Sequence, residues 1–578
     1  MATVKNTTVN DTGHTTVANG STAQRPATPV LGMMRYNSTI DVLEQYTSVG
    51  WQGIEPPPVI LGTSGTIFAN ENSTITIDGS NFRSGSVVSI SGAATGGIER
   101  QLSTTFVNST QLTAATNAAS VNYITNSVFN VKVANPTGLS STLENGGTTD
   151  SKPTWTTTAG LLGHISDLSR GIKTFTLVAS DPDNNAISYS VVSGSLPSNM
   201  TLNSSTGVIS GTPSGVVSDT TSSFTVRATA NSQTIDRAFS ITVKAPGKST
   251  FSYTGSNQTF NIPTGVDRIR VKMWGGGGGN YYTGNPGGSA GAGGYTETTF
   301  NVLSGETTLT VLVGGGGAYA DGNYNPAAMG GGTAGENGGS AGGGGSHLIS
   351  GTLANAGFTI RTDVGAGGYS GARPTSHPST ELSGKVGASQ IIAVAGGGGG
   401  AGWFNSSGQD GGNGGGITGG GGYNGGTEYA GGGTQTAGGY GAGSYGTAGI
   451  FLRGGVITYN GSGGGSAGAG GGWYGGGTCQ GQAGNNFGGG AGSGFVGYAN
   501  GSTSTVLTAN GSNGSFSDSV TRTNGSRTYT NSQCLRSGVA GFGSPPNTGD
   551  ADYASGVGLG IGYGNTATGG NGRVVLIF

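Results

Sequence analysis

The sequence predicts an all-β protein, in which β-sandwiches in tandem precede a further β-sandwich whose strands support inserted glycine-rich loops. Short runs of alternating apolar and polar residues, separated by Gly, Asn and Ser turns, recur through the first 250 residues, as in sandwich folds. Of the 124 glycines in the 578 residues, 101 come after residue 250. Strand-like runs such as Arg573–Phe578 border the glycine tracts. These apolar borders indicate ordered structure in the glycine-rich part.

Composition excludes several classes of function. The formal charge is −2, from 24 basic and 26 acidic side chains, so no long-range field favours nucleic acid or an anionic membrane. The first residues form no apolar leader, and no stretch approaches the ~18 apolar residues of a membrane span. Glycine occurs in runs, such as 275–279, without the strict triplet period of collagen. We expect no nucleic-acid partner and no membrane insertion.

Catalytic and metal-binding patterns are weak. The four histidines lie far apart in sequence, and none has the spacing to cysteine or carboxylate that zinc sites show. No pair of carboxylates can be nominated for glycoside cleavage. We therefore expect no enzyme, no catalytic residue, no cofactor and no metal site. The two cysteines, Cys479 and Cys534, either pair with each other or remain free thiols.

Residues 1–54 form the first predicted unit. Residues 1–30 are polar and rich in Thr and Asn, which predicts an extended arm that orders only on a partner. Short alternating runs around residues 31–37, 43–46 and 51–54 predict two or three small strands with aromatic plugs. So few residues cannot bury a sufficient core alone, so this piece is expected to trimerise or to dock on something larger.

A motif in this unit carries a resemblance. It reads Gly32-Met-Met-Arg35-Tyr36-Asn37, then Glu44-Gln-Tyr46, then Trp51. It resembles the N-terminal module of structural proteins of tailed phages, particularly fibre, whisker and neck proteins of marine myophages. The resemblance implies a virion-attachment module, with these residues as its attachment candidates: Arg35, Tyr36, Asn37, Tyr46 and Trp51. The alternative is a hairpin that caps the next domain.

Residues 55–147 form the second predicted unit, after the stiff spacer Glu55-Pro-Pro-Pro58. Its strand-like runs are Ile75–Phe82, Ser86–Ile90, Thr105–Val107, Gln111–Thr113 and Phe129–Val133. Such spacing predicts a β-sandwich. The segments Ile77–Phe82 and Asn130–Gly138 resemble the IPT/TIG immunoglobulin-like family.

Residues 148–246 form the third predicted unit. Its marker runs are Phe175–Asp183, Ile187–Val191, Leu196-Pro197, Gly207–Pro213 and Phe224–Ala228. They resemble the cadherin-like immunoglobulin family of surface proteins and phage fibres. In that family the positions of Asp181 and Asp183 sometimes carry calcium ligands. One Asp-Pro-Asp does not supply the six to eight oxygens that calcium needs, so a turn is the competing interpretation.

Residues 247–578 form the fourth predicted unit, in which strand-like runs such as 267–274, 308–313 and 391–395 lead directly into glycine. The region resembles the glycine-rich domain of phage fibre tips and of some receptor tyrosine kinase ectodomains. The resemblance implies left-handed polyglycine II helices in a hexagonal lattice. A helix with three residues per turn and no internal bonds directs every N–H and C=O at its neighbours, and only Gly permits such close packing.

Aromatic residues interrupt the glycine tracts where loops between such helices should turn. Exposed rings on a rigid scaffold make low-entropy contacts with sugars or proteins; the competing interpretation is that they fill gaps under the lattice. The receptor-contact candidates are Tyr281, Tyr282, Trp403, Phe404, Tyr440, Trp473 and Tyr474, and other tyrosines in similar positions are Tyr423, Tyr429, Tyr445 and Tyr498.

The order of units is that of a fibre. The leading hypothesis is a phage virion protein, assembled in the host cytoplasm as a homotrimer, with other virion structural proteins at its N-terminus and a host-surface glycan or protein at its tip. One alternative is a purely architectural head, neck or capsid-decorating fibre. The other is a cellular adhesin or matrix protein. The attachment point on the virion and the receptor stay open at this stage.

Overall fold

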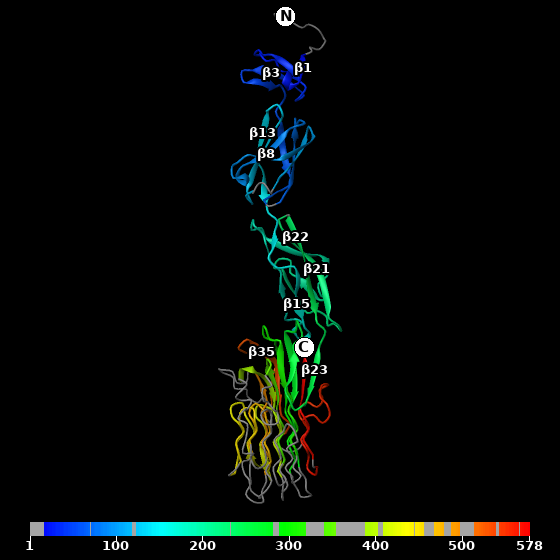
Figure 1. The fold of residues 1–578 in the computed structure, drawn as a ribbon, viewed down its shortest axis with the longest axis vertical. Coiled ribbons are helices and arrows are strands. Elements are labelled where there is room, and N and C mark those ends of the chain that lie inside the picture. The colour runs from blue at the N-terminus through cyan, green and yellow to red at the C-terminus, as the bar shows by residue number, and fades with distance from the viewer. Residues whose placement is uncertain are drawn as a thin grey trace, which may run out of the picture.

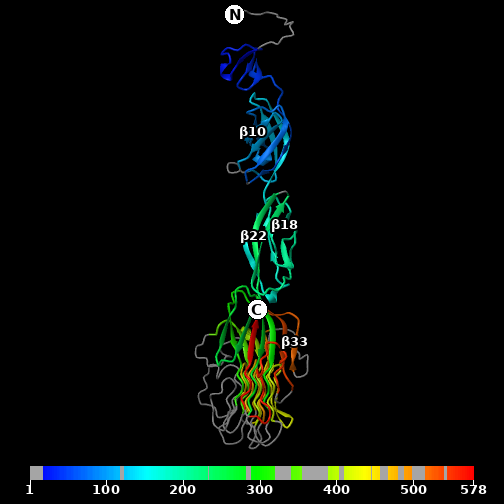
Figure 2. The same cartoon turned by 90° about the vertical axis from the view of Figure 1, so that its right-hand side faces the viewer.

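The computed structural model of the chain is an elongated rod of β units that follow one another in sequence order (Figures 1 and 2). The N-terminal unit lies at one end and the glycine-rich unit at the other, while the C-terminus returns to the junction of the last two units (Figure 1). The described residues contain β-strands and short 3₁₀ turns but no α-helix. The structure describes residues 17–69, 71–117, 123–231, 233–280, 288–318, 340–353, 388–402, 409–443, 446–455, 467–478, 487–497, 514–538, 543–565 and 567–578.

The N-terminal unit is one small sheet in the order β1-β2-β3-β4. Its elements are β1 (Ala18–Gly20), the 3₁₀ turn η1 (Thr22–Gln24), β2 (Met34–Asn37), β3 (Val42–Thr47) and β4 (Gly50–Gly53). The short strands predicted here are confirmed. The arm was expected to lack structure of its own, and this is corrected for its second half, because β1 pairs in parallel with β2 through Ala18↔Arg35.

The next unit packs two sheets face to face, in the orders β10-β11-β7-β5 and β6-β13-β12-β8-β9. Its elements are β5 (Val59–Ser64), β6 (Ile67–Phe68), β7 (Thr74–Ser80), β8 (Val87–Ser91), η2 (Ala93–Thr95), β9 (Arg100–Gln101), β10 (Ser103–Asn108), β11 (Gln111–Ala115), β12 (Val128–Ala134) and β13 (Ser140–Asp150). Alternate side chains from both sheets, including Ile75, Ile77 and Val131, fill the core between them.

The third unit has a main sheet in the order β15-β22-β21-β18, a second sheet β16-β20-β19 and the pair β14-β17. Its elements are β14 (Thr154–Trp155), β15 (Gly160–Ile165), η3 (Asp167–Ser169), β16 (Phe175–Thr176), β17 (Ala179–Ser180), β18 (Ile187–Gly194), β19 (Met200–Leu202), β20 (Val208–Gly211), β21 (Thr220–Ala230) and β22 (Gln233–Val243). The unit has an apolar core of its own, which includes the packed rings of Trp155, Phe224 and Phe239.

The glycine-rich unit contains two larger sheets, β23-β36-β25-β26-β35-β33 and β24-β27-β28-β29-β32. A shared core that includes Val271, Val311 and Leu576 joins them. The elements are β23 (Lys248–Ser252), β24 (Gln258–Asn261), β25 (Arg268–Trp274), β26 (Tyr295–Asn301), β27 (Thr308–Leu312), β28 (Ser346–Ser350), η5 (Ala388–Gln390), β29 (Ile391–Ala395), β30 (Gly422–Asn424), β31 (Thr427–Ala430), β32 (Phe495–Val496), β33 (Phe516–Asp518), β34 (Arg522–Asn524), β35 (Arg527–Leu535) and β36 (Arg573–Ile577).

Below these strands the chain continues as extended glycine segments that run side by side (Figure 2). In the segment 275–280 the direction of backbone hydrogen bonding repeats every three residues. The N–H groups of Gly275 and Gly278 donate to 288–294, those of Gly276 and Gly279 donate to 340–345, and those of Gly277 and Asn280 donate to 567–572. None of 275–279 has a positive φ. This threefold pattern is that of a polyglycine II helix, and the predicted fold class is confirmed.

The same segment also accepts hydrogen bonds from three further neighbours. The carbonyls of Gly276 and Gly279 accept from 396–401, that of Gly277 accepts from Gly317, and that of Gly278 accepts from Ile561. Three donor directions and three acceptor directions place six neighbours around one helix, which is hexagonal packing. All backbone N–H groups of 275–280 and the carbonyls of 276–280 thus have hydrogen-bond partners, as burial favours.

Polar contacts join successive units. Glu55 of the N-terminal linker accepts from Arg83 Nε at 2.9 Å and from Thr137 Oγ1 at 2.6 Å. At the last junction, Asp267 Oδ2 accepts from Lys173 Nζ at 2.8 Å. Such contacts fix the path of the chain from one unit into the next.

Candidate functional site

The N-terminal module is organised around one buried carboxylate. Glu44 on β3 accepts from Arg25 Nη2 at 2.6 Å and from Asn37 Nδ2 at 3.0 Å, and Arg35 Nε lies 3.5 Å from its other oxygen. Burial opposes ionisation of Glu44, but the hydrogen bonds from Arg25 and Asn37 outweigh it and lower the pKa of Glu44. The two guanidinium groups and the carboxylate hold the sheet together where an apolar core is lacking.

Aromatic rings cover this ionic cluster. The Tyr46 and Trp51 rings lie 5.4 Å apart, and the guanidinium carbons of Arg25 and Arg35 each lie 6.0 Å from the Trp51 ring centre. A cation over an aromatic face adds stabilisation. The ring of Trp51, which lies on β4, therefore covers the two guanidinium groups of the cluster.

The structure brings the predicted attachment residues together but assigns them different tasks. Arg35 and Asn37 are buried, so the expectation that their side chains contact a partner directly is corrected: they support the sheet from inside. Tyr36, Tyr46 and Trp51 are half-buried, and the Tyr36 hydroxyl donates to Asp41. The more exposed surface of the module consists of other residues.

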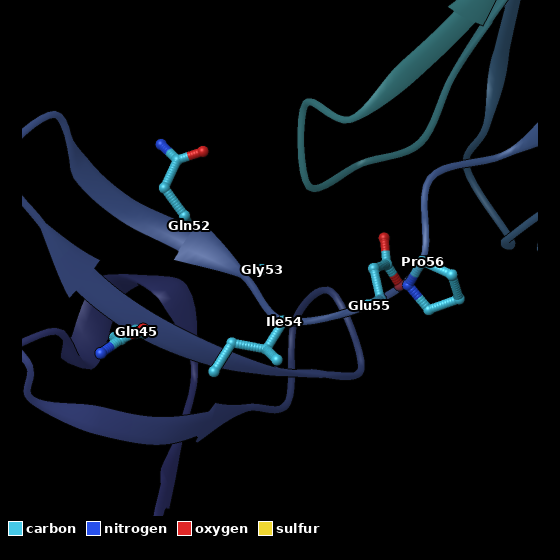
Figure 3. Close-up of a pocket in the computed structure, with 6 residues that line it drawn as sticks. All are labelled: Gln45, Gln52, Gly53, Ile54, Glu55 and Pro56. Atoms are coloured by element: carbon cyan, nitrogen blue, oxygen red, sulfur yellow. The ribbon is translucent and has the colours of Figure 1, made fainter.

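Exposed apolar side chains supply part of that surface. Val30, Leu31 and Met34 lie before and on β2, and Val49 lies in the turn between β3 and β4; all four are exposed. An open cavity of about 480 Å³ lies where the module meets the next unit, lined by Gln45, Gln52, Gly53, Ile54, Glu55 and Pro56 (Figure 3). Sequence reasoning missed these residues.

The candidate contact residues of the glycine-rich unit are only partly described. Tyr281, Tyr282, Trp403 and Phe404 lie outside the described residues. Tyr440 is 52% exposed, and Tyr474 is half-buried beside Phe451 and Trp473. Among the described candidates, Tyr440 is therefore the most exposed residue.

Trp473 is corrected from a contact residue to a core residue. Its side chain is fully buried, stacked on Phe495 at 3.6 Å between ring centres. The indole Nε1 donates to the Gln435 carbonyl at 3.0 Å. The ring fills the space between the five-stranded sheet and the glycine segments, together with Leu312 and Val394. Burying so large an aromatic ring removes much apolar surface from water, which favours a core position over an exposed one.

The Asp-Pro-Asp segment forms a turn. Asp181 Oδ1 accepts from the N–H groups of Asp183 and Asn185 at 3.0 and 3.1 Å. Asp183 Oδ2 accepts from Ser151 N at 2.7 Å, across the junction to the preceding unit. Within the described part of the chain, no group of three or more His, Cys, Asp or Glu side chains is arranged to hold a metal ion.

Two nucleophilic or basic side chains of the glycine-rich unit are deeply buried. Cys534 is a free thiol, and burial raises its pKa to about 12; Cys479 lies outside the described residues. His347 on β28 is also fully buried, and burial lowers its pKa to about 4. Both are placed for packing, since neither reaches solvent.

His347 predicts a pH dependence of stability. As pH falls below 6.5, His347 becomes protonated in the unfolded chain, whereas in the folded chain it stays neutral until about pH 4. The free energy of unfolding of the glycine-rich unit should therefore fall by about 3 kcal/mol across this window. Calorimetric melting at pH 7.0 and 4.5 measures it. His347→Leu should show a smaller drop; equal drops in both proteins would contradict the assignment.

Within the described ranges, no helix is long and apolar enough to cross a membrane.

Two family models match parts of the chain. Residues 172–244 match the family described as "Putative Ig domain". Residues 251–328 match the family described as "Glycine-rich domain". No curated protein matches the chain.

Three solved structures align with parts of the chain. An I-band fragment of titin aligns at 11% identity over 42% of this chain and 94% of its own, with a TM-score of 0.22. The protocadherin GammaB4 extracellular domain aligns at 13% identity over 38% of this chain and 39% of its own, with a TM-score of 0.15. An endo-fucoidan hydrolase of glycoside hydrolase family 107 aligns at 13% identity over 43% of this chain and 42% of its own, with a TM-score of 0.17. The family matches and the all-β rod together fit an extended structural or adhesive protein that combines an immunoglobulin-like domain with a glycine-rich domain.

Proposed function

We propose that the chain is a non-enzymatic fibre protein of a tailed-phage virion, assembled in the host cytoplasm as a homotrimer. The N-terminal module docks on other virion structural proteins, the two sandwiches act as spacers, and the glycine-rich unit faces the host surface. The observation that carries the proposal is the order of units along the rod, with a small module at one end and a rigid glycine lattice at the other (Figure 1).

The composition of the N-terminal module supports docking. Among its described residues, Val42 is the only apolar side chain that is fully buried, whereas Val30, Leu31 and Val49 are exposed. A unit with this balance gains stability by covering apolar surface against a partner or against copies of itself. The motif around Arg35-Tyr36-Asn37 resembles virion-attachment modules, which favours a virion protein as that partner.

The lattice supports a role at the host surface. Its backbone hydrogen bonds tie segments far apart in sequence into one body, so side chains on its borders are held with little freedom. Such preorganisation lowers the entropy lost on binding. This preorganisation supports assigning the surface-attachment role to this unit.

Two truncations test the proposal. Removing residues 1–54 should abolish incorporation into particles and leave the rest folded, because the sandwiches have cores of their own. Removing residues 247–578 should preserve incorporation and abolish saturable binding of particles to host cells. Incorporation and cell binding are measured on purified particles. Incorporation without residues 1–54, or undiminished binding without residues 247–578, would contradict the proposal.

One observation favours a purely architectural fibre as the second candidate. Trp473 is buried and Tyr474 half-buried, so these aromatic residues serve packing. Under this alternative the particles lacking residues 247–578 bind host cells as well as intact particles and lose only integrity or shape.

A further inference from the structure

A polar cavity of about 350 Å³ lies against the glycine lattice, beside the exposed contact candidate Tyr440. Its floor is lattice backbone from three segments, 419–421, 431–432 and 438–439. Its volume is at the lower end of the ~300–1,000 Å³ typical of small-ligand pockets. The side chains that line it are those of Thr418, Tyr423, Glu428, Thr434, Tyr440 and Arg536.

Glycine gives the cavity its floor. A Cβ on Gly421 would overlap the carboxyl carbon of Glu428, and a Cβ on Gly431 would overlap the ring of Tyr440. Both side chains therefore lie directly on the backbone. The absence of a Cβ at these two glycines lets the two functional side chains lie flat against the lattice.

A carboxylate is held between two phenols on one side of the cavity. Glu428 on β31 accepts from Tyr440 at 3.1 Å and from Tyr423 on β30 at 3.3 Å. Burial, then the charge of Glu428, raises the pKa of Tyr423. Glu428 is exposed and Tyr440 is 52% exposed, so an acceptor and an aromatic face both reach the opening.

A guanidinium lines the same cavity. Arg536 Nη1 donates to the Thr418 carbonyl at 2.9 Å, and Nε is buried without an acceptor in the part of the chain that the structure describes. Arg536 forms no ion pair with Glu428 among the described residues, although both line the cavity. One cationic and one anionic side chain are therefore available on separate parts of the wall.

We propose that this cavity binds a neutral saccharide unit of a cell-surface glycan. A sugar ring offers an apolar C–H face to the Tyr440 ring, hydroxyl donors to Glu428 and hydroxyl acceptors to Arg536. The opposite charges of the wall balance, so neither an anion nor a cation is favoured over a neutral polar ligand. The inference rests on the proposed attachment function and names its ligand class.

The test uses the full-length chain and an array of neutral glycans that carry terminal hexoses, deoxyhexoses, pentoses and N-acetylhexosamines, with sialylated glycans as the anionic arm. We expect at least one neutral glycan to bind. Tyr440→Ala should weaken that binding about tenfold or more, as loss of a central aromatic contact does, and Glu428→Gln should weaken it several-fold. The matched control is Tyr563→Ala, a tyrosine of the same unit that is 51% exposed outside the cavity, and it should bind as the parent does.

Failure to bind any neutral glycan, binding that Tyr440→Ala and Glu428→Gln leave unchanged, or Tyr440-dependent preference for the sialylated arm would each overturn the proposal. Because both side chains are exposed, unchanged melting temperatures are expected, and they confirm that the variants are folded. Host-cell binding is measured in parallel. Cell binding by the parent that neither variant reduces overturns the cavity and leaves the attachment function standing. Glycan binding lost in Tyr440→Ala, with no cell binding by the parent, supports the cavity and overturns the attachment function.

Discussion

Gly276→Ala is expected to lower the free energy of unfolding of the glycine-rich unit by about 3 kcal/mol, at the upper end of overpacking effects. The new Cβ would overlap the carbonyl of Gly315, which is itself fixed in a neighbouring lattice segment. Backbone cannot rotate aside as a flexible side chain would. A Cβ on Gly277 would overlap the carbonyl of Leu559, and a Cβ on Gly278 would overlap the carbonyl of Gly399. These carbonyls belong to two other neighbouring segments. Replacing all three residues should therefore prevent the unit from folding.

Calorimetric melting and limited proteolysis of the full-length chain measure this effect. The matched control is Gly543→Ala, since a Cβ there meets nothing within 4 Å and the φ of Gly543 is not positive. This control should melt at or slightly above the parent temperature, because Ala restricts the unfolded chain. Equal melting of Gly276→Ala and Gly543→Ala would show that the run 275–279 is not packed as described.

Glu44→Gln is expected to unfold the N-terminal module at room temperature. Removing one partner of a buried ion pair costs about 3 to 5 kcal/mol, because the remaining charge stays buried. Here Arg35 is buried and Arg25 half-buried beside Glu44, and the module has little apolar core to offset the loss. Particles that carry the variant should lose the fibre, as after removal of residues 1–54.

Amide hydrogen exchange of residues 34–53 measures the unfolding, and Trp51 fluorescence follows the loss of its guanidinium contacts. Glu99→Gln is the control, since its pair with Lys132 is exposed on both sides, and such pairs contribute at most about 1 kcal/mol. Protected amides in Glu44→Gln would contradict the structural role of this carboxylate.

Much of the fold could be predicted from local pattern. Alternation and turn residues located β7, β12 and β25. The lattice was implied by the resemblance of the glycine-rich part to a known family, and it is physically possible because only Gly permits such close packing. The run 175–183 was less informative: it contributes β16 to one sheet and β17 to another, with Leu177 buried between them. Such a crossing depends on packing of distant strands, which alternation does not encode.

The candidate sites could be predicted only in part. The motif indicated the residue set around Arg35 and Tyr46, including Glu44, which lies opposite Arg35 in the β2–β3 pair. The contribution of Arg25 could not be predicted, because it depends on where the arm lies against the sheet. Aromatic position could not separate the exposed Tyr440 from the buried Trp473, because both follow glycine and only the lattice decides which faces solvent. Tyr423 was visible as an interrupting aromatic, whereas Arg536, which directly follows the end of β35, gave no signal in the sequence.

The position of β36 between β23 and β25 has a consequence for biosynthesis. Strand β23 begins the glycine-rich unit and β36 ends it, and their residues pair from Lys248↔Ile577 to Ser252↔Arg573; β36 also pairs with β25. The larger sheet can close only after residues 573–577 have left the ribosome, so β23 and β25 lack their shared neighbour while the preceding sandwiches can already fold. A polypeptide that lacks β36 would therefore carry the module and the two sandwiches without a closed glycine-rich sheet.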